Sequence, residues 1–330
     1  MTTRANIVCL GAGRMGRGIA VAFAYAGHTV TMIDVKDRSA EDFTKLEADA
    51  LGEVRRTFTS LAGLGLIAET DADVLIGRVS VVPAGQSHAA LSNAGMIFEG
   101  VPEVVELKRE ILASISQQTR PDTIIASTTS TILVDHLSGA IANPRRFLNV
   151  HWLNPAYLIP LVEVSPGAAT TPAIVDQVKA LLEGIGKVPV VCAATPGFIV
   201  PRIQALAMNE AARMVEEGVA SAKEIDKAIR YGFGFRYAVL GLLEFIDWGG
   251  GDILYYASRY LEGALGSDRY RAPDVVSRNM REGRIGLRTG AGFLDYSGLD
   301  VDAYRVERLK AMVDLLRHFG LARPPVLDRS

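Results

Sequence analysis

The chain has little cysteine and contains neither a basic block nor a long apolar run. Only two of its 330 residues are Cys, and both Cys9 and Cys192 lie in apolar runs, so we expect reduced thiols in buried strands rather than disulfides. Lys and Arg (35) nearly balance Asp and Glu (37), which disfavours nucleic acid as a partner. No apolar run suits a membrane helix, and the first residues do not follow the layout of a signal peptide. The sequence therefore predicts a cytoplasmic protein that does not enter a membrane.

Short apolar runs alternate with helical patterns over the first half of the chain. Strands are predicted at residues 6–10, 28–34, 95–99, 123–126, 147–150, 161–164 and 188–191. Helices are predicted at residues 15–26, 39–63, 69–77, 106–118 and 171–185. This alternation predicts an α/β fold with a doubly wound, mostly parallel sheet.

The pattern changes near Thr195, where a part without convincing strands begins. Helices are predicted there at residues 203–217, 222–231, 240–248, 253–263 and 303–319. We therefore expect two domains, an α/β domain at residues 1–194 and an all-α domain at residues 195–330. The apolar faces expected in the second domain include Leu240, Leu243, Phe245 and Ile246.

A glycine-rich turn lies between the first predicted strand and the first predicted helix. Gly11, Gly13 and Gly16 are spaced as Gly-x-Gly-x-x-Gly, with Arg14 and Met15 between the last two. The glycines allow a tight turn, bring backbone N–H groups close to a pyrophosphate and let the helix pack closely on the sheet. The helix N-terminus then favours the negative charge. The turn predicts a Rossmann-type dinucleotide site.

Asp34 ends the second predicted strand, 18 residues after Gly16. A carboxylate at this place accepts hydrogen bonds from the adenosine ribose and repels a 2′-phosphate, so the expected cofactor is NAD rather than NADP. Lys36 and Arg38 lie close by in the sequence and would favour a phosphate. We interpret these two side chains as ordinary loop charges.

His151 and Glu163 lie twelve residues apart in two short apolar runs that an Asn-Pro loop joins. Two strands connected in this way could bring the side chains together. A carboxylate that holds one ring nitrogen of a His fixes its tautomer and raises its basicity, which suits a base that takes a proton from an alcohol. The alternative is a surface His and an unrelated strand Glu.

Several motifs, in this order, resemble the 3-hydroxyacyl-CoA dehydrogenase family along nearly the whole chain. They are residues 11–16, 99–103 with Leu107 and Lys108, 126–130, 151–163, 196–199 and 286–296. Within the family the chain is most similar to the L-gulonate 3-dehydrogenase/lambda-crystallin branch, on residues 154–160, 215–218, 234–238 and 258–263. That resemblance implies a small polar hydroxy acid as substrate rather than an acyl-CoA.

The resemblance also implies roles for individual side chains. His151 would be the catalytic base and Glu163 its orienting partner. Ser130 would bond the substrate oxygen, and Asn154 would lie near the nicotinamide and the substrate. The residues implied to border the cofactor are Gly100, Glu103 and Lys108.

Two positions qualify this picture. Ser130 could instead be the N-cap of a helix that begins at Ile132. Pro201 stands where the family usually has an Asn that helps to hold the reacting group, and Pro offers no side-chain donor and no backbone N–H. In the first turn of a helix Pro is favourable, so activity can persist with altered substrate contacts. Gln204, three residues further on, would share the same helix face and could supply an amide.

The sequence therefore predicts an NAD-dependent dehydrogenase that oxidises the secondary alcohol of a 3-hydroxy acid or a related small hydroxy acid, without a metal. The alternatives are a 3-hydroxyacyl-CoA dehydrogenase and a non-catalytic, crystallin-like relative. Arg236, in a Gly-rich connection, could bind a substrate carboxylate through two hydrogen bonds or pair with Glu244 or Asp247. The second domain is expected to carry the substrate pocket, and the resemblance implies a homodimer through it.

Overall fold

The computed structural model describes residues 5–326, so the residues on which the prediction of no signal peptide chiefly rests lie outside this range. The chain forms two compact units, Met1–Ala207 and Met208–Ser330. Helix α8 (Val200–Glu216) begins in the first unit and continues into the second. The boundary predicted after residue 194 precedes this helix, whereas the compact units divide within it. Among the residues that the structure describes, no helix combines the length and the apolar character needed to span a membrane.

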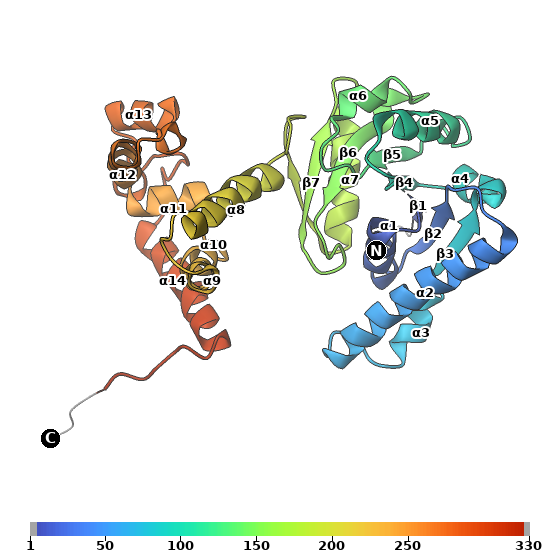
Figure 1. The fold of residues 1–330 in the computed structure, drawn as a ribbon, viewed down its shortest axis with the longest axis horizontal. Coiled ribbons are helices and arrows are strands. Elements are labelled where there is room, and N and C mark those ends of the chain that lie inside the picture. Colours follow the sequence, from blue (N-terminus) through green and yellow to red (C-terminus); the bar gives the residue numbers. More distant parts are fainter. Residues whose placement is uncertain (1–4, 327–330) are drawn as a thin grey trace. The chain divides into compact units, whose positions relative to one another are not determined.

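The first unit is built on one eight-stranded sheet with the order β3-β2-β1-β4-β5-β6-β7-β8 (Figure 1). The strands are β1 (Asn6–Leu10), β2 (Thr29–Asp34), β3 (Val79–Pro83), β4 (Met96–Glu99), β5 (Ile124–Ser127), β6 (Phe147–Trp152), β7 (Leu161–Pro166) and β8 (Val188–Val191). All pairs are parallel except β6 with β7. This topology confirms the doubly wound sheet expected from the sequence.

Helices cover both faces of this sheet. They are α1 (Arg14–Tyr25), α2 (Ala40–Gly63), α3 (Asp71–Ile76), α4 (His88–Ser92), α5 (Val105–Ser116), α6 (Val134–Ser138) and α7 (Pro172–Gly184). Alternation along β1 divides the core in two. Ile7 and Cys9 pack into the cluster that includes Phe23 of α1, whereas Val8 and Leu10 belong to the cluster on the opposite face.

Three strands and α-helices of the first unit, β3, α4 and α6, were not predicted from the sequence. β3 is a five-residue edge strand that ends in Pro83, and both helices have only five residues. Elements of this length show too few residues to establish a period, so their position depends on the neighbours they pack against. Cys9 is buried in β1 as predicted, but Cys192 follows β8 and is only partly buried, because β8 forms the other edge of the sheet.

The second unit is helical. It contains the end of α8, α9 (Ala222–Ala228), a π-helical turn (Ile229–Gly234), α10 (Phe235–Tyr237), α11 (Leu242–Gly249), α12 (Gly251–Leu265), α13 (Asp274–Arg281) and α14 (Val301–His318). Between residues 208 and 326 only isolated β-bridges occur, which confirms the all-α prediction. α13 was not predicted from the sequence, because it is short and largely polar.

A buried carboxylate holds the loop between α13 and α14. Asp247 of α11 is 2% exposed and accepts hydrogen bonds from the backbone N–H groups of Phe293 (2.9 Å) and Leu294 (2.8 Å) and from the hydroxyl of Tyr296 (3.2 Å). A Cβ atom at Gly292 would lie 2.1 Å from Oδ1 of Asp247, so only glycine fits there. The family-like segment 286–296 is thus explained by the structure it builds around one carboxylate.

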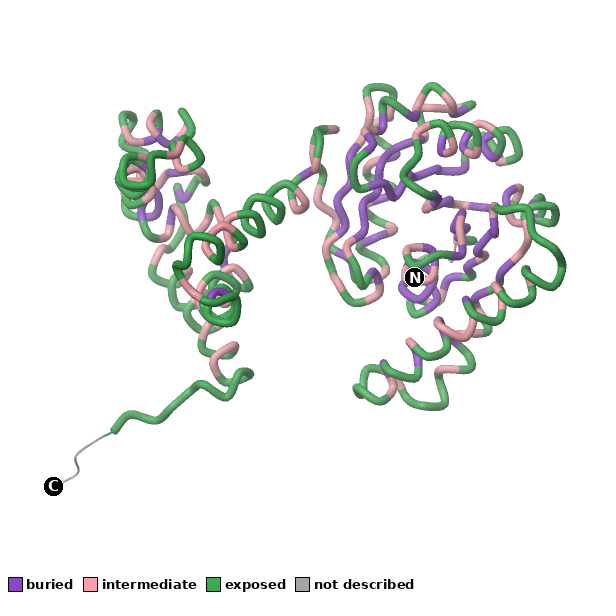
Figure 2. The backbone as a smooth tube through the Cα atoms, viewed as in Figure 1, coloured by how far each residue is buried: buried purple, intermediate pink, exposed green. Residues whose placement is uncertain are grey.

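Few residues of the second unit are buried (Figure 2). Among its described residues the buried apolar ones are Ile225, Leu240, Val276, Leu287 and Tyr296. Two helices present exposed apolar stripes with helical spacing: Ile253, Tyr256 and Tyr260 on α12, and Val306, Leu309 and Val313 on α14. Of the apolar residues expected on such a face in the sequence analysis, Leu240 is buried and Leu243 is exposed.

Candidate active site

The dinucleotide turn lies between β1 and α1. Gly11 has φ +100°, and a Cβ atom at Gly16 would lie 2.1 Å from the carbonyl oxygen of Gly11, so both positions require glycine. A Cβ atom at Gly13 would meet nothing within 4 Å, and no side chain caps the helix that begins at Arg14. The free N–H groups at this helix start, with open space before them, fit a dinucleotide pyrophosphate.

Asp34 ends β2 beside this turn and is 4% exposed. Its Oδ2 accepts a hydrogen bond of 2.6 Å from Nε of Arg38, and its Oδ1 accepts one of 3.3 Å from the backbone N–H of Lys36. Arg38 is therefore more than an ordinary loop charge, because it pairs directly with the carboxylate expected to bind the ribose. The role of Asp34 at the ribose stays a prediction.

A buried lysine organises the next two strand ends. Lys108 of α5 is 1% exposed, and its Nζ lies 2.8 Å from Oε1 of Glu99, 2.9 Å from the carbonyl oxygen of Val101 and 3.2 Å from Oε2 of Glu103. Glu99 also accepts a hydrogen bond of 2.6 Å from the Ser127 hydroxyl of β5. Glu99 is not among the site residues predicted from the sequence. A carboxylate at the end of a buried strand is the signal that could have found it.

Glu103 connects this lysine to the loop after β5. Its Oε1 accepts hydrogen bonds from the Thr129 hydroxyl (2.7 Å) and from the backbone N–H of Ser130 (2.8 Å). Burial alone would raise the pKa of Glu103, but these hydrogen bonds and the charge of Lys108 outweigh it and lower the pKa below its ordinary value. Glu103 therefore stays ionised and holds the Ser130 loop.

His151 and Glu163 face each other across the antiparallel pair β6–β7, where they are direct register partners. Nδ1 of His151 lies 2.8 Å from Oε2 of Glu163, and Nε2 lies 3.2 Å from Oγ of Ser130. His151 is 5% exposed and Glu163 is fully buried. The imidazole thus has a carboxylate on one nitrogen and a hydroxyl on the other.

Ser130 does not cap a helix. Its Oγ contacts His151, whereas the hydroxyl of Thr129 accepts the backbone N–H groups of Thr131 (3.2 Å) and Ile132 (2.9 Å). α6 itself starts later and has no side-chain cap. The N-cap alternative for Ser130 is therefore wrong, because no helix begins at Ile132 and the backbone N–H groups of Thr131 and Ile132 donate to the hydroxyl of Thr129.

These side chains line one cavity of about 400 Å³ at the carboxyl ends of the parallel strands. It is lined by Arg14, Met15, Gly100, Val101, Glu103, Lys108, Thr128, Thr129, Ser130, His151, Trp152, Leu153, Asn154, Pro201 and Gln204. Ligands of doubly wound folds bind at this edge, where the strand order reverses between β1 and β4. The structure thus brings Pro201 and Gln204 of α8 to the same cavity as His151.

Arg236 lies in α10 of the second unit and is exposed. Its guanidinium lies 5.2 Å from the ring centroid of Phe245. Neither acidic partner considered for it is available in the described residues, because Glu244 binds Tyr304 and Arg308 and Asp247 binds the loop at residues 293–296. The assignment of Arg236 to the substrate stays a prediction.

Fold and site together define an NAD-dependent oxidoreductase acting on CH–OH groups. The model of the 3-hydroxyacyl-CoA dehydrogenase NAD-binding domain matches residues 6–195, and that of the family's C-terminal domain matches residues 197–296. The chain belongs to the 3-hydroxyacyl-CoA dehydrogenase family.

The relatives differ in the substrates that their names give. A 5-formyl-3-hydroxy-2-methylpyridine 4-carboxylate 5-dehydrogenase of Mesorhizobium japonicum is 31% identical over 94% of this chain and 97% of its own. A lambda-crystallin homolog of Mus musculus is 33% identical over 78% of this chain and 79% of its own. The solved structure of a 3-hydroxyacyl-CoA dehydrogenase of Archaeoglobus fulgidus has a TM-score of 0.75 at 31% identity, covering 97% of this chain and all of the other.

Proposed function

We propose that this protein oxidises the secondary alcohol of a 3-hydroxy acid or a related small hydroxy acid, with His151 as general base. The observation that carries the proposal is the chain of contacts Glu163–His151–Ser130, which ends in the cavity next to the dinucleotide turn. In the reverse direction the same cavity reduces a keto acid.

Glu163, His151 and Ser130 each have one task in this reaction. Nε2 of His151 takes the hydroxyl proton of the substrate, while Ser130 donates a hydrogen bond to the substrate oxygen. Glu163 accepts a hydrogen bond from the N–H group at Nδ1, which selects the tautomer with a free Nε2 and stabilises the imidazolium that forms. Bound NAD would supply the hydride acceptor, and Gly100 and Asn154, which line the cavity, would hold its nicotinamide end. Glu103 and Lys108 keep the Ser130 loop in place.

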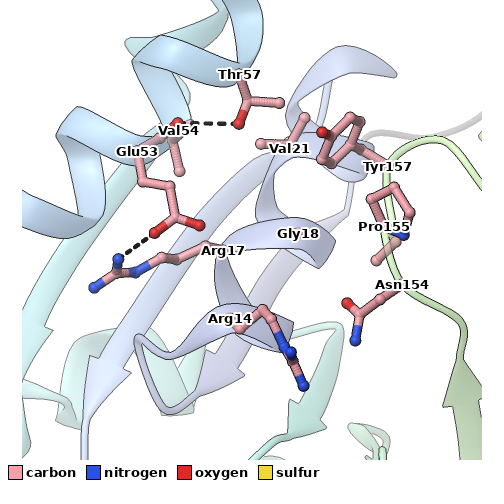
Figure 3. Close-up of a pocket in the computed structure, with 11 residues that line it drawn as sticks. Arg14, Arg17, Gly18, Val21, Glu53, Val54, Thr57, Asn154, Pro155 and Tyr157 are labelled. Atoms are coloured by element: carbon pink, nitrogen blue, oxygen red, sulfur yellow. Dashed lines mark hydrogen bonds and ion pairs between the residues drawn. The ribbon is translucent and has the colours of Figure 1, made fainter.

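A second cavity next to the first bears on the substrate class. It has a volume of about 300 Å³ between α1, α2 and the loop after β6, and it shares Arg14 and Asn154 with the catalytic cavity (Figure 3). A substrate longer than a small acid would extend into it. This groove therefore favours the second candidate function, the oxidation of a 3-hydroxyacyl-CoA thioester.

The charges of this groove favour the small acid instead. Arg17 is held by Asp49 (2.8 Å), by Glu53 and by the carbonyl oxygen of Ala12 (2.8 Å), so its charge is neutralised. Figure 3 shows Arg17 directed to Glu53, whereas Arg14 projects away from it. Within residues 5–326, Arg14 is the one cation of the groove without an ion-pair partner. Coenzyme A carries several phosphates, and a single free cation is too little positive charge to bind them.

A substrate panel separates the two candidates. NADH formation is measured by absorbance with 3-hydroxy acids, with other small hydroxy acids and with the matching CoA thioesters. We expect kcat/KM to be at least about tenfold higher for an acid than for its thioester, which corresponds to about 1.4 kcal/mol of transition-state binding. A preference for the thioester would establish the second candidate.

NADH should bind more tightly than NADPH. The carboxylate of Asp34 repels a 2′-phosphate, and Arg38 is already paired with it. We expect a dissociation constant for NADPH at least about tenfold higher, measured by isothermal titration calorimetry. Replacing Asp34 by Ser frees Arg38 and should narrow the difference. Equal or tighter binding of NADPH to the unmodified protein would contradict the prediction and assign the site to Arg38 and Lys36.

We further propose that the protein is a cytoplasmic homodimer in which residues 1–194 bind the cofactor and residues 195–330 form the dimer contact. The exposed apolar stripes on α12 and α14 support this proposal. The second unit buries few apolar residues, so it gains stability when a second copy covers these stripes. Light scattering at micromolar concentration should give twice the chain mass of 35.4 kDa. Charged substitutions at Tyr256 and Tyr260 should shift the mass toward the monomer. A fully active monomer would contradict the proposal.

A further inference from the structure

The turn that leads into α8 has an unusual backbone. Phe198 has φ +42°, and among residues 5–326 it is the one non-glycine residue with positive φ. Gly197 before it has φ +77°. A bulky side chain in this region is strained by contact with its own backbone, and glycine would relieve the strain. A Phe in this conformation therefore points to a task for its ring.

The ring of Phe198 contacts the imidazole of His151. The two ring centroids lie 5.4 Å apart with an angle of 31° between the planes, and Phe198 is 4% exposed. The two neighbouring contacts of His151 are Glu163 at Nδ1 and Ser130 at Nε2. Phe198 thus packs against a ring whose two nitrogens are already held by these two residues.

The same turn also binds the partner of His151. The backbone N–H groups of Ile199 and Val200 donate to Oε1 of Glu163, at 2.9 Å and 2.8 Å. Oε2 of this carboxylate remains directed at Nδ1 of His151. One short segment therefore holds both members of the pair, one through an aromatic ring and the other through two backbone donors.

We propose that Phe198 is a positioning residue that keeps the imidazole of His151 in the orientation in which Nε2 faces Ser130 and the cavity. This inference rests on the proposed role of His151. The strained backbone serves to bring the ring over the imidazole while the next two N–H groups reach Glu163. Without the Phe198 ring, the imidazole of His151 can tilt about its hydrogen bond to Glu163. This tilt moves Nε2 away from the substrate hydroxyl.

Three substitutions test the proposal. Phe198→Tyr keeps the ring and should retain kcat within about threefold. Phe198→Leu keeps an apolar side chain of similar size without the flat ring, and Phe198→Gly relieves the backbone but removes the ring. Both should lower kcat by roughly 10- to 100-fold and leave KM and the dissociation constant of NADH within about twofold. Phe58→Leu, in the core of the same unit, is the matched control that should lower the melting temperature but not kcat.

A double variant identifies the route by which Phe198 acts. If Phe198 acts through His151, adding Phe198→Leu to His151→Ala should cause no further loss of kcat. An additional loss of the full single-variant size would overturn the proposal, and so would wild-type kcat in the Leu and Gly variants. If His151→Ala alone keeps normal turnover, the proposed function fails. If His151→Ala loses turnover while the Phe198 variants do not, only the role of Phe198 fails.

Discussion

Replacement of His151 by Ala should lower kcat by roughly 10²-fold or more. The expected loss follows from the removal of the one side chain whose ring nitrogen lies 3.2 Å from Ser130 inside the cavity. NADH should bind as before, because His151 contacts Ser130, Glu163 and Phe198 and not the glycine turn. The measurements are steady-state turnover with the best substrate of the panel and titration with NADH.

The matched control for this variant is His136→Ala. His136 lies exposed on α6, so its replacement should change neither turnover nor NADH binding. Turnover near normal in His151→Ala would remove the general-base role, and with it the proposed mechanism.

Replacement of Glu163 by Gln should lower kcat by roughly 10²- to 10⁴-fold with little loss of stability. Both carboxylate oxygens of Glu163 accept hydrogen bonds, one from Nδ1 of His151 and the other from the start of α8. A Gln side chain has one acceptor and one donor group. When its oxygen serves Ile199 and Val200, its NH₂ group faces Nδ1 and selects the wrong tautomer of His151.

The Glu163→Ala variant should be less stable than the Glu163→Gln variant, in addition to its loss of turnover. The backbone donors of Ile199 and Val200 then lose their acceptor, which costs about 1–3 kcal/mol for each such group that stays buried. Thermal unfolding of Glu163→Ala, Glu163→Gln and the exposed control Glu183→Gln measures this difference. Equal kcat values for wild type and Glu163→Gln would show that Glu163 only supports the helix.

Sequence patterns were sufficient for those parts of the fold and site that depend on local spacing. The glycine turn, the strand before it and the acidic residue at the end of β2 lie within about 30 residues, and each is determined by the backbone and charge requirements of a bound dinucleotide. The long elements α1, α2 and α14 show enough residues to reveal a helical period. Short elements such as β3, α4 and α6 were missed, because their positions depend on packing against neighbours.

Other properties were decided only by the tertiary structure. Glu99 and Lys108 are distant from His151 in the sequence, yet they and Glu103 hold the loop of Ser130, because parallel strand ends converge at one edge of the sheet. The hydroxyl of Thr129, and not that of Ser130, accepts the backbone N–H groups that follow. Sequence spacing alone could not distinguish these two hydroxyl groups.

The sequence by itself determined the class of fold and the cofactor, because each depends on residue types at fixed spacings. It also pointed to several residues that line the cavity, such as His151 and Ser130, but not to others, such as Thr128 and Trp152. Only the tertiary structure decided that the turn before α8 binds Glu163 and covers His151. That contact joins residues about 40 positions apart, and it requires a left-handed conformation at Phe198 that no sequence pattern predicts.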